Sequence, residues 1–290
     1  MAEFLQFLFS GLTVGAVYAL VALGFTLVYN ACDVVNFAQG EFVMLGGMTT
    51  VFLALAGVPL PLAALLAVVA AVAVGLMLYR LAIEPARGAS AVTLIMITIG
   101  ASVFLRGLAQ TLFDKRFHSL PPWFGSEPIR VGGAAILPQS LVVLAGAAII
   151  VVLLWQFIDR TLVGKAITAT AANRLAARLV GINTRRIVAL SFAVSAAIGA
   201  VAGILVTPIT LTSYDAGTLL ALKAFAAAML GGMGSALGAV IGGVALGMLE
   251  AFSAGYLSSN YKDAIAFLVI LAVLFAMPQG LLGRGKVDRV

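Results

Sequence analysis

Long stretches without a charged residue constrain the fold of this chain more than any other feature of its sequence. Five such runs lie between Glu3 and Asp33, Glu41 and Arg80, Arg130 and Asp159, Arg186 and Asp215, and Asp263 and Arg284. Each reaches the ~20 residues that an α-helix needs to cross a bilayer. Only 10% of the residues are charged, against about 25% in soluble domains, so the chain lacks the polar surface of a soluble globule. Strands of a membrane barrel would alternate apolar and polar residues, and these runs do not. We predict an all-α, polytopic membrane protein.

The breaks between the apolar runs indicate how many times the chain enters the membrane. A single transmembrane domain over residues 1–290 accounts for all of them, with about eight or nine membrane segments. The expected spans cover about 4–29, 36–57, 62–79, 91–113, 137–157, 187–209 and 264–280, with the region 216–252 interrupted by glycines at 231–235. Because that region is short for two full spans of ~20 residues each, we expect at least one broken or incomplete helix.

The segment 158–186 is the longest polar stretch that still has a helical pattern, and it predicts the orientation of the chain. It carries one acid, Asp159, and six basic residues: Arg160, Lys165, Arg174, Arg178, Arg185 and Arg186. Lys and Arg accumulate in the cytoplasmic loops of membrane proteins. We therefore expect 158–186 and the basic tail 284–290 to be cytoplasmic, and the N-terminus to lie outside.

Within this segment we predict one amphipathic helix that ends at Gly181, since glycine commonly follows the last turn of a helix. One face carries Ala172, Leu175, Ala176 and Leu179, at helical spacing, and another carries Thr170, Arg174 and Arg178. Two hypotheses fit this pattern. The helix could lie on the membrane surface with its arginines on lipid phosphates, or it could dock a cytoplasmic partner.

Small residues recur every fourth position in two regions and predict close helix packing. The first region, in the first span, contains Gly11, Gly15 and Ala19. The second region contains two adjacent series, one at residues 231, 235, 239, 243 and 247 and the other at residues 234, 238 and 242. Two adjacent stripes of small side chains on one helix would let that helix pack closely against two neighbouring helices. The residues that we assign to helix packing are Gly11, Gly15, Gly234, Gly238, Gly242, Gly243 and Gly247.

Polar side chains inside apolar spans are costly and are therefore candidates for function. The candidate pathway-lining residues are Asn36, Gln39, Glu41 and Glu250. Asn36 is also expected to cap the second span, with Gln39 completing a capping box. Lys223 and Asp263 are further charged groups at or near membrane depth, and Lys223 could simply extend its ammonium to the interface.

Catalytic and metal-binding chemistry has no support in the sequence. His118 is the only histidine and Cys32 the only cysteine, so a His/Cys metal site and an intrachain disulfide are both excluded by number. The sequence has neither a phosphate-binding G-x-x-x-x-G-K-[ST] loop nor a G-x-S-x-G or H-E-x-x-H motif. We expect no enzyme activity, no metal and no cofactor in this chain.

Five stretches resemble the membrane permeases of high-affinity branched-chain amino acid ABC importers, specifically the shorter of the two permease types. They follow the order of that family over nearly the whole chain and comprise YALVALGFTLVYN (18–30), NFAQGEFVMLG (36–46), GKAITATAANRLAARLVGIN (164–183), AFAAAMLGGMGSALGAVIGGVALGMLE (224–250) and PQGLLG (278–283).

The resemblance implies a multi-pass protein of the bacterial inner membrane with several partners. These are a second, homologous permease, two cytoplasmic ATPase subunits that bind ATP and Mg²⁺, and a periplasmic substrate-binding protein. It also implies that 158–186 is the coupling segment, with ATPase-docking positions Ala171, Ala172, Arg174, Ala176, Ala177, Arg178 and Gly181. The Glu-Ala-Ala opening of the classical importer loop is missing, because Thr170 precedes Ala171.

Two alternatives remain open from the sequence. The same importer architecture could carry urea, short amides or another small solute. A channel or secondary transporter without ATPases is the other alternative, but such proteins usually contain inverted repeats and carboxylates at midplane. The sequence shows no clear repeat, and its acids lie near the ends of the spans.

Overall fold

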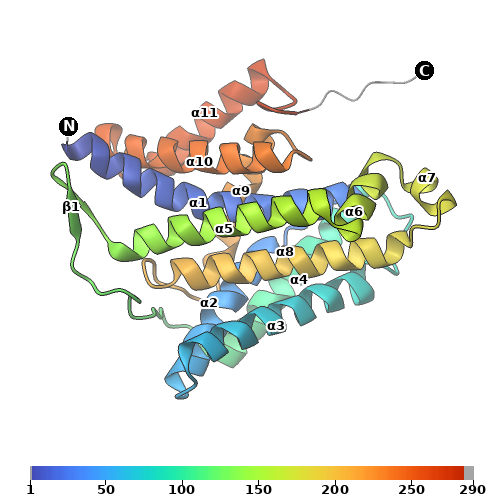
Figure 1. Ribbon diagram of the computed structural model, residues 1–290, viewed down its shortest axis with the longest axis horizontal. Helices are drawn as coiled ribbons and strands as arrows, with labels where there is room; N and C mark the ends of the chain where they lie inside the picture. The colour runs from blue at the N-terminus through green and yellow to red at the C-terminus, as the bar shows by residue number, and fades with distance from the viewer. Residues whose placement is uncertain (1, 284–290) are drawn as a thin grey trace.

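The computed structural model describes residues 2–283 as a bundle of long helices with roughly parallel axes (Figure 1). Six of its helical segments are long and apolar enough to cross a membrane. They are α1 (Ala2–Cys32), α3 (Leu60–Leu78) with its π-helical continuation η1 (Tyr79–Ile83), α4 (Ala91–Phe113), α5 (Pro138–Arg160), α8 (Thr184–Val206) and α10 (Ala236–Phe252) with its continuation η2 (Ser253–Leu257).

Apart from the apolar helix α6 (Leu162–Ala172), which at 11 residues is too short for a span, three shorter apolar helices bring the number of candidate membrane segments in residues 2–283 to nine. They are α2 (Gln39–Leu55), α9 (Ala216–Gly231) and α11 (Lys262–Ala276). At 17, 16 and 15 residues, all three are shorter than the ~20 residues of a full span. The predicted polytopic all-α fold with incomplete helices is therefore confirmed.

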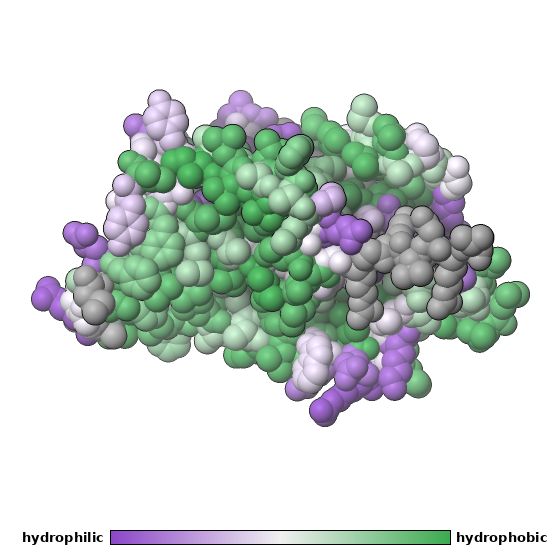
Figure 2. All heavy atoms as spheres, turned by 90° about the horizontal axis from the view of Figure 1, so that it is seen from above, coloured by the Kyte–Doolittle hydropathy of each residue, from purple (hydrophilic) through white to green (hydrophobic). Residues whose placement is uncertain are grey.

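Helix α1 forms the centre of the bundle, and it is buried over most of its length from Gly11 to Val28. The helices α3, α4 and α5 instead expose many large apolar side chains, such as Leu65, Phe104 and Leu153. Hydrophobic side chains cover most of the face in Figure 2, and hydrophilic ones gather at its edges. In a bilayer, lipid rather than water would cover such a surface.

Different elements lie at the two ends of the bundle. We call the end that carries α6 (Leu162–Ala172) and α7 (Arg174–Leu179) the basic end. The start of α1 lies at the opposite end (Figure 1), beside a hairpin of β1 (Ile129–Val131) and β2 (Ala134–Ile136). Gly283, the last described residue, packs against Gly232 near the basic end of α1. The segment 158–186 and residue 283 thus share one end; the basic tail 284–290 lies outside the described residues.

Helices α2 and α9 begin inside the bundle rather than at its ends. Gln39, the first residue of α2, lies beside Ser195 in the middle of α8, and Gly217 of α9 lies against Gly40 of α2. In both cases a long helix is followed by a non-helical return and a short helix, and α1 and α8 run in opposite directions (Figure 1). The pair α1 and α2 and the pair α8 and α9 thus share this order of elements, although the sequence shows no clear repeat.

Candidate coupling and pathway sites

The segment 158–186 forms two short helices, which corrects the prediction of one amphipathic helix. Asn173 separates α6 from α7 with an extended backbone (φ −158°), and its side-chain oxygen accepts a hydrogen bond from the Ala176 N–H at 2.9 Å. Asparagine favours this capping geometry over a helix interior. Gly181 follows α7 with φ +88°, a conformation that glycine adopts without strain. The end of the helix at Gly181 is therefore as predicted.

The exposed face of α7 is apolar. Leu175 and Leu179 are 69% and 81% exposed, whereas Ala177 is buried against the bundle. Ala171, Ala172 and Ala176 are also exposed, so small and apolar side chains dominate the outer surface of the segment. Figure 1 shows that α7 projects beyond the long helices. An exposed apolar surface of this kind is suited to contact with another protein.

Arg174 and Arg178 do not lie on this apolar face. The Arg174 guanidinium donates a hydrogen bond to the carbonyl oxygen of Ala31, in the last turn of α1. Arg178 Nε donates to Thr184 Oγ1 at the start of α8, at 3.0 Å. A cation at the carbonyl end of a helix is stabilised by the helix dipole. The two arginines therefore hold α7 against the bundle, with its leucines outward.

The start of α2 brings two candidate pathway residues together, in a way that differs from the predicted capping box. The side-chain oxygen of Asn36 accepts from the Ala38 N–H at 3.2 Å, within the turn that precedes the helix, and Ala38 is the N-cap. Gln39 accepts a hydrogen bond from Ser195 Oγ at 2.6 Å and donates one to the Ser195 carbonyl oxygen at 3.1 Å. Its amide joins α2 to α8 instead of capping α2.

Glu41 lies inside the bundle and is 1% exposed. Ser102 Oγ of α4 donates to its Oε1 at 2.8 Å. Arg106, also on α4, donates to Thr218 Oγ1 of α9 at 3.0 Å, and both groups lie beside the carboxylate. This network joins α2, α4 and α9. Arg106 is the one charged residue between 91 and 113, but it was not among the predicted pathway residues.

Glu250 belongs to a second polar cluster, which includes Lys223. Lys223 Nζ lies 3.0 Å from Glu250 Oε1 and 2.9 Å from Asp263 Oδ1. Tyr18 Oη donates to Glu250 Oε2 at 2.7 Å, and the Lys223 ammonium lies 5.7 Å from the centre of the Tyr18 ring. The Lys223 charge is thus paired with two carboxylates, of which Glu250 is buried and Asp263 is half-exposed at the start of α11. The cluster joins α1, α9, α10 and the start of α11.

Replacing Lys223 by Met is expected to destabilise the protein by about 3–5 kcal/mol, since it leaves the buried Glu250 carboxylate without its cation. The double change Lys223→Met with Glu250→Gln removes both charges and should recover part of this loss. The measurement is the thermal unfolding midpoint of detergent-solubilised protein. Lys165→Met, which changes an exposed lysine of α6, is the control; equal midpoints for Lys223→Met and the control would contradict the prediction.

The assigned glycines lie at two helix–helix contacts. Gly11 and Gly15 of α1 face Gly243 and Gly247 of α10, and a Cβ at Gly15 would lie 2.8 Å from the Cα of Val244. On another side of α10, Gly238 and Gly242 face residues 227–231 of α9. Helix α10 thus packs on two neighbours through separate glycine stripes, where the backbones approach too closely for any side chain.

Gly234 is an exception to the helical stripes. It has φ +94° and lies in the turn between α9 and α10, where its carbonyl oxygen accepts from Asn30 Nδ2 at 2.9 Å. Its assignment to a helix–helix contact is therefore corrected. The spacing of four residues is real, but the helix begins only at Ala236, and glycine at 234 supplies the positive φ of the turn.

Comparison with known proteins identifies relatives of this chain. Residues 7–274 match the family described as branched-chain amino acid transport system / permease component. The chain is 37% identical, over 303 aligned residues, to the high-affinity branched-chain amino acid transport system permease protein LivH of Salmonella typhimurium, with 99% of this chain and 98% of LivH covered. The corresponding protein BraD of Pseudomonas aeruginosa is 36% identical over the same shares of both chains.

A solved structure has a similar fold. PsaBC from Streptococcus pneumoniae, determined in complex with Fab, matches with a TM-score of 0.50 over 96% of this chain and 93% of that chain, at 15% identity. At this identity the likeness concerns the fold alone. The family match covers most of the residues, and the relatives align over almost their whole length. This chain therefore belongs to the family of branched-chain amino acid transport system permease components.

Proposed function

We propose that this chain is one permease subunit of an ABC importer that moves branched-chain amino acids across the bacterial inner membrane and forms half of the translocation pathway. The observation that supports this most strongly is the 37% identity over 99% of the chain to a permease named for high-affinity branched-chain amino acid transport. A second, homologous permease completes the pathway, and a periplasmic binding protein delivers the solute.

The proposed coupling element is α7 with the end of α6. Its exposed Leu175, Leu179 and flanking alanines would insert into a groove of a cytoplasmic ATPase subunit. ATP and Mg²⁺ bind to two such subunits, which carry out hydrolysis, while this chain is non-catalytic and needs no cofactor. The concentration of Lys and Arg at the basic end supports its placement in the cytoplasm, with the N-terminus outside.

The proposed contribution to the pathway is the region where the first turns of α2 and α9 meet. The amino ends of helices carry partial positive charge, and half-helices that begin inside a membrane protein often face anionic groups of the substrate. A free amino acid presents such a carboxylate. Asn36, Gln39 and Glu41 lie at this point, and Glu250 lies in the neighbouring Lys223 cluster; these four residues remain the candidates that line the pathway.

Reconstitution tests this proposal directly. The permease is co-expressed with its partner permease, the ATPase subunits and the binding protein, and uptake of labelled leucine, isoleucine and valine into proteoliposomes is measured. We expect uptake that requires ATP and all subunits and that stops with an ATPase variant unable to hydrolyse ATP. Uptake by the permease without ATPases would instead indicate a channel or secondary transporter, and uptake of urea or amides in preference to these amino acids would overturn the assigned cargo.

A further inference from the structure

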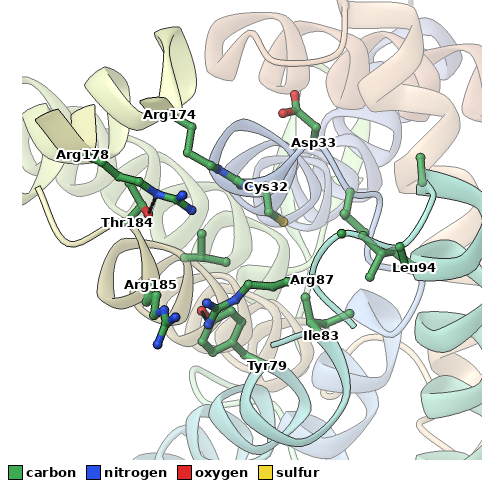
Figure 3. A pocket seen from close by; sticks show the side chains of 15 residues that line it. Cys32, Asp33, Tyr79, Ile83, Arg87, Leu94, Arg174, Arg178, Thr184 and Arg185 are labelled. Atoms are coloured by element: carbon green, nitrogen blue, oxygen red, sulfur yellow. Dashed lines mark hydrogen bonds between the residues drawn. The ribbon is translucent and has the colours of Figure 1, made fainter. Parts of the chain in front are cut away.

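A cavity of about 350 Å³ opens at the basic end, away from the exposed face of α7. It lies between the end of α1, η1 and the loop that follows it, α7 and the first turn of α8 (Figure 3). Its volume falls within the ~300–1,000 Å³ of small-molecule sites. The cavity therefore has room for a ligand, and its lining indicates which kind.

Four arginines from three separate parts of the chain line this cavity: Arg87, Arg174, Arg178 and Arg185. Among the described lining residues the one acid is Asp33, whose carboxylate points away from Arg87 and Arg185 in Figure 3. Glu84, outside the cavity, pairs with Arg87. Arg87, Arg178 and Arg185 are solvent-exposed and Arg174 is half-buried, so the lining presents a large excess of positive charge to solvent, which attracts anionic ligands.

Three of the four guanidinium groups are held in place by the protein. Arg174 donates to the Ala31 carbonyl oxygen, Arg178 donates to Thr184, and Arg87 donates to Tyr79 Oη at 3.4 Å. These bonds use only some of the five N–H donors that each guanidinium carries. Arginines ordered before binding lose less conformational entropy when they bind, and their planar fork matches phosphate oxygens in two-point contacts.

The same cavity has an apolar part. Ile83, Leu94 and Val188 line it together with the arginines. A second cavity lined by Arg87, Arg178 and residues 181–185 adjoins it through shared residues. The arginine cavity lies where η1 meets the start of α4, and these segments expose apolar side chains nearby, such as Leu81 and Met96. Basic pockets at this depth between membrane helices suit the headgroups of anionic lipids.

We propose that this arginine cavity binds a phosphate group, carried by the headgroup of an anionic phospholipid or by a small free phosphate compound. An occupant would bridge η1, α7 and α8, and would thereby stiffen the connection of α7 to the bundle. This inference concerns the inner side of α7 and does not rest on the identity of the transported solute or on ATPase docking by the outer side.

The test measures binding to the purified full-length chain with two probes, phosphatidylglycerol and inorganic phosphate, using native mass spectrometry for the lipid and calorimetry for the ion. Arg185→Gln removes one cavity guanidinium. Arg186→Gln is the matched control, because it makes the same change on the next residue of α8, which is exposed, as Arg185 is, but does not line the cavity. Circular dichroism and size-exclusion elution verify that both variants are folded.

We expect wild-type protein to retain phosphatidylglycerol, Arg185→Gln to weaken its binding roughly tenfold or more, as for a lost charged hydrogen bond, and Arg186→Gln to bind like wild type. Arg185→Lys should recover only part of the affinity. Competition by inorganic phosphate at millimolar concentration would identify a free phosphate as sufficient, and binding of the lipid alone would identify the headgroup as the ligand.

Several results would overturn the proposal. Wild-type protein that binds neither probe has no such site. Equal weakening by Arg185→Gln and Arg186→Gln would indicate general surface charge rather than a cavity. If Arg185→Gln left both probes bound but reduced co-purification of the ATPase subunits, the arginines would instead belong to the protein-docking surface.

Discussion

Leu179→Asp is expected to abolish ATP-dependent uptake while the permease remains folded in the membrane. Leu179 is 81% exposed on α7, so a carboxylate there disturbs no contact within this chain. In an ATPase groove, however, the charge would be desolvated without a partner. A loss of about 2 kcal/mol or more, as at the central residues of interfaces, corresponds to an affinity roughly thirtyfold weaker.

The measurement for Leu179→Asp combines uptake in proteoliposomes with the amount of ATPase that co-purifies with the permease. Leu179→Met is the matched control at the same position, since it keeps the apolar character and nearly the same volume. This variant should retain both uptake and the co-purification of the ATPase. Normal uptake by Leu179→Asp, with the ATPase still bound, would rule out α7 as the docking element.

Gly243→Leu is expected to prevent correct packing of α10 on α1. A Cβ at Gly243 would already lie 2.5 Å from the Cα of Ala19, far inside van der Waals contact, and the obstacle is backbone that cannot rotate away. Leucine must therefore push the two helices apart and break the contact along the whole glycine stripe. Forcing this much bulk into a packed contact costs about 3 kcal/mol or more, a large share of the ~5–15 kcal/mol of a typical fold.

Gly100→Leu is the control for this change, since Gly100 is an exposed helical glycine of α4 with no heavy atom within 4 Å of a Cβ placed there. The measurement is the yield of monodisperse protein after detergent extraction, together with its unfolding midpoint. We expect a severe loss for Gly243→Leu and a yield near wild type for Gly100→Leu. Comparable yields for the two variants would show that the stripe is not needed for packing.

The helical membrane fold could be predicted from the sequence because the bilayer imposes a local requirement. About twenty apolar residues without charge suffice to mark a span, and this condition can be read along the chain without its partners in space. The end of α7 before Gly181 could be predicted for the same reason, since the end of a helix depends on residues that are neighbours in the sequence. The helix break at Asn173 was not predicted, although asparagine favours the N-cap position at the start of a helix.

The polar clusters could not be assembled in this way. Glu250 and Lys223 could each be recognised as charges in apolar surroundings, but their pairing with each other and with Asp263 joins residues up to 40 positions apart. Arg106 was overlooked, and its place beside Glu41 follows only from the packing of α4 against α2. Contacts between distant residues depend on how helices cross, which the spacing within one helix does not specify.

By itself, the sequence determined that this chain is a polytopic helical membrane protein, that 158–186 carries its concentrated positive charge, and that series of small residues lie in the first apolar span and in the region 216–252. These features follow from hydrophobicity and spacing, which act locally. The tertiary structure decided that α2 and α9 begin inside the bundle and that four arginines share a cavity. It also decided that Arg174 and Arg178 bond to α1 and α8 while Leu175 and Leu179 face outward. Each of these depends on which segments pack together, because only the folded chain brings their backbones and charges within contact distance.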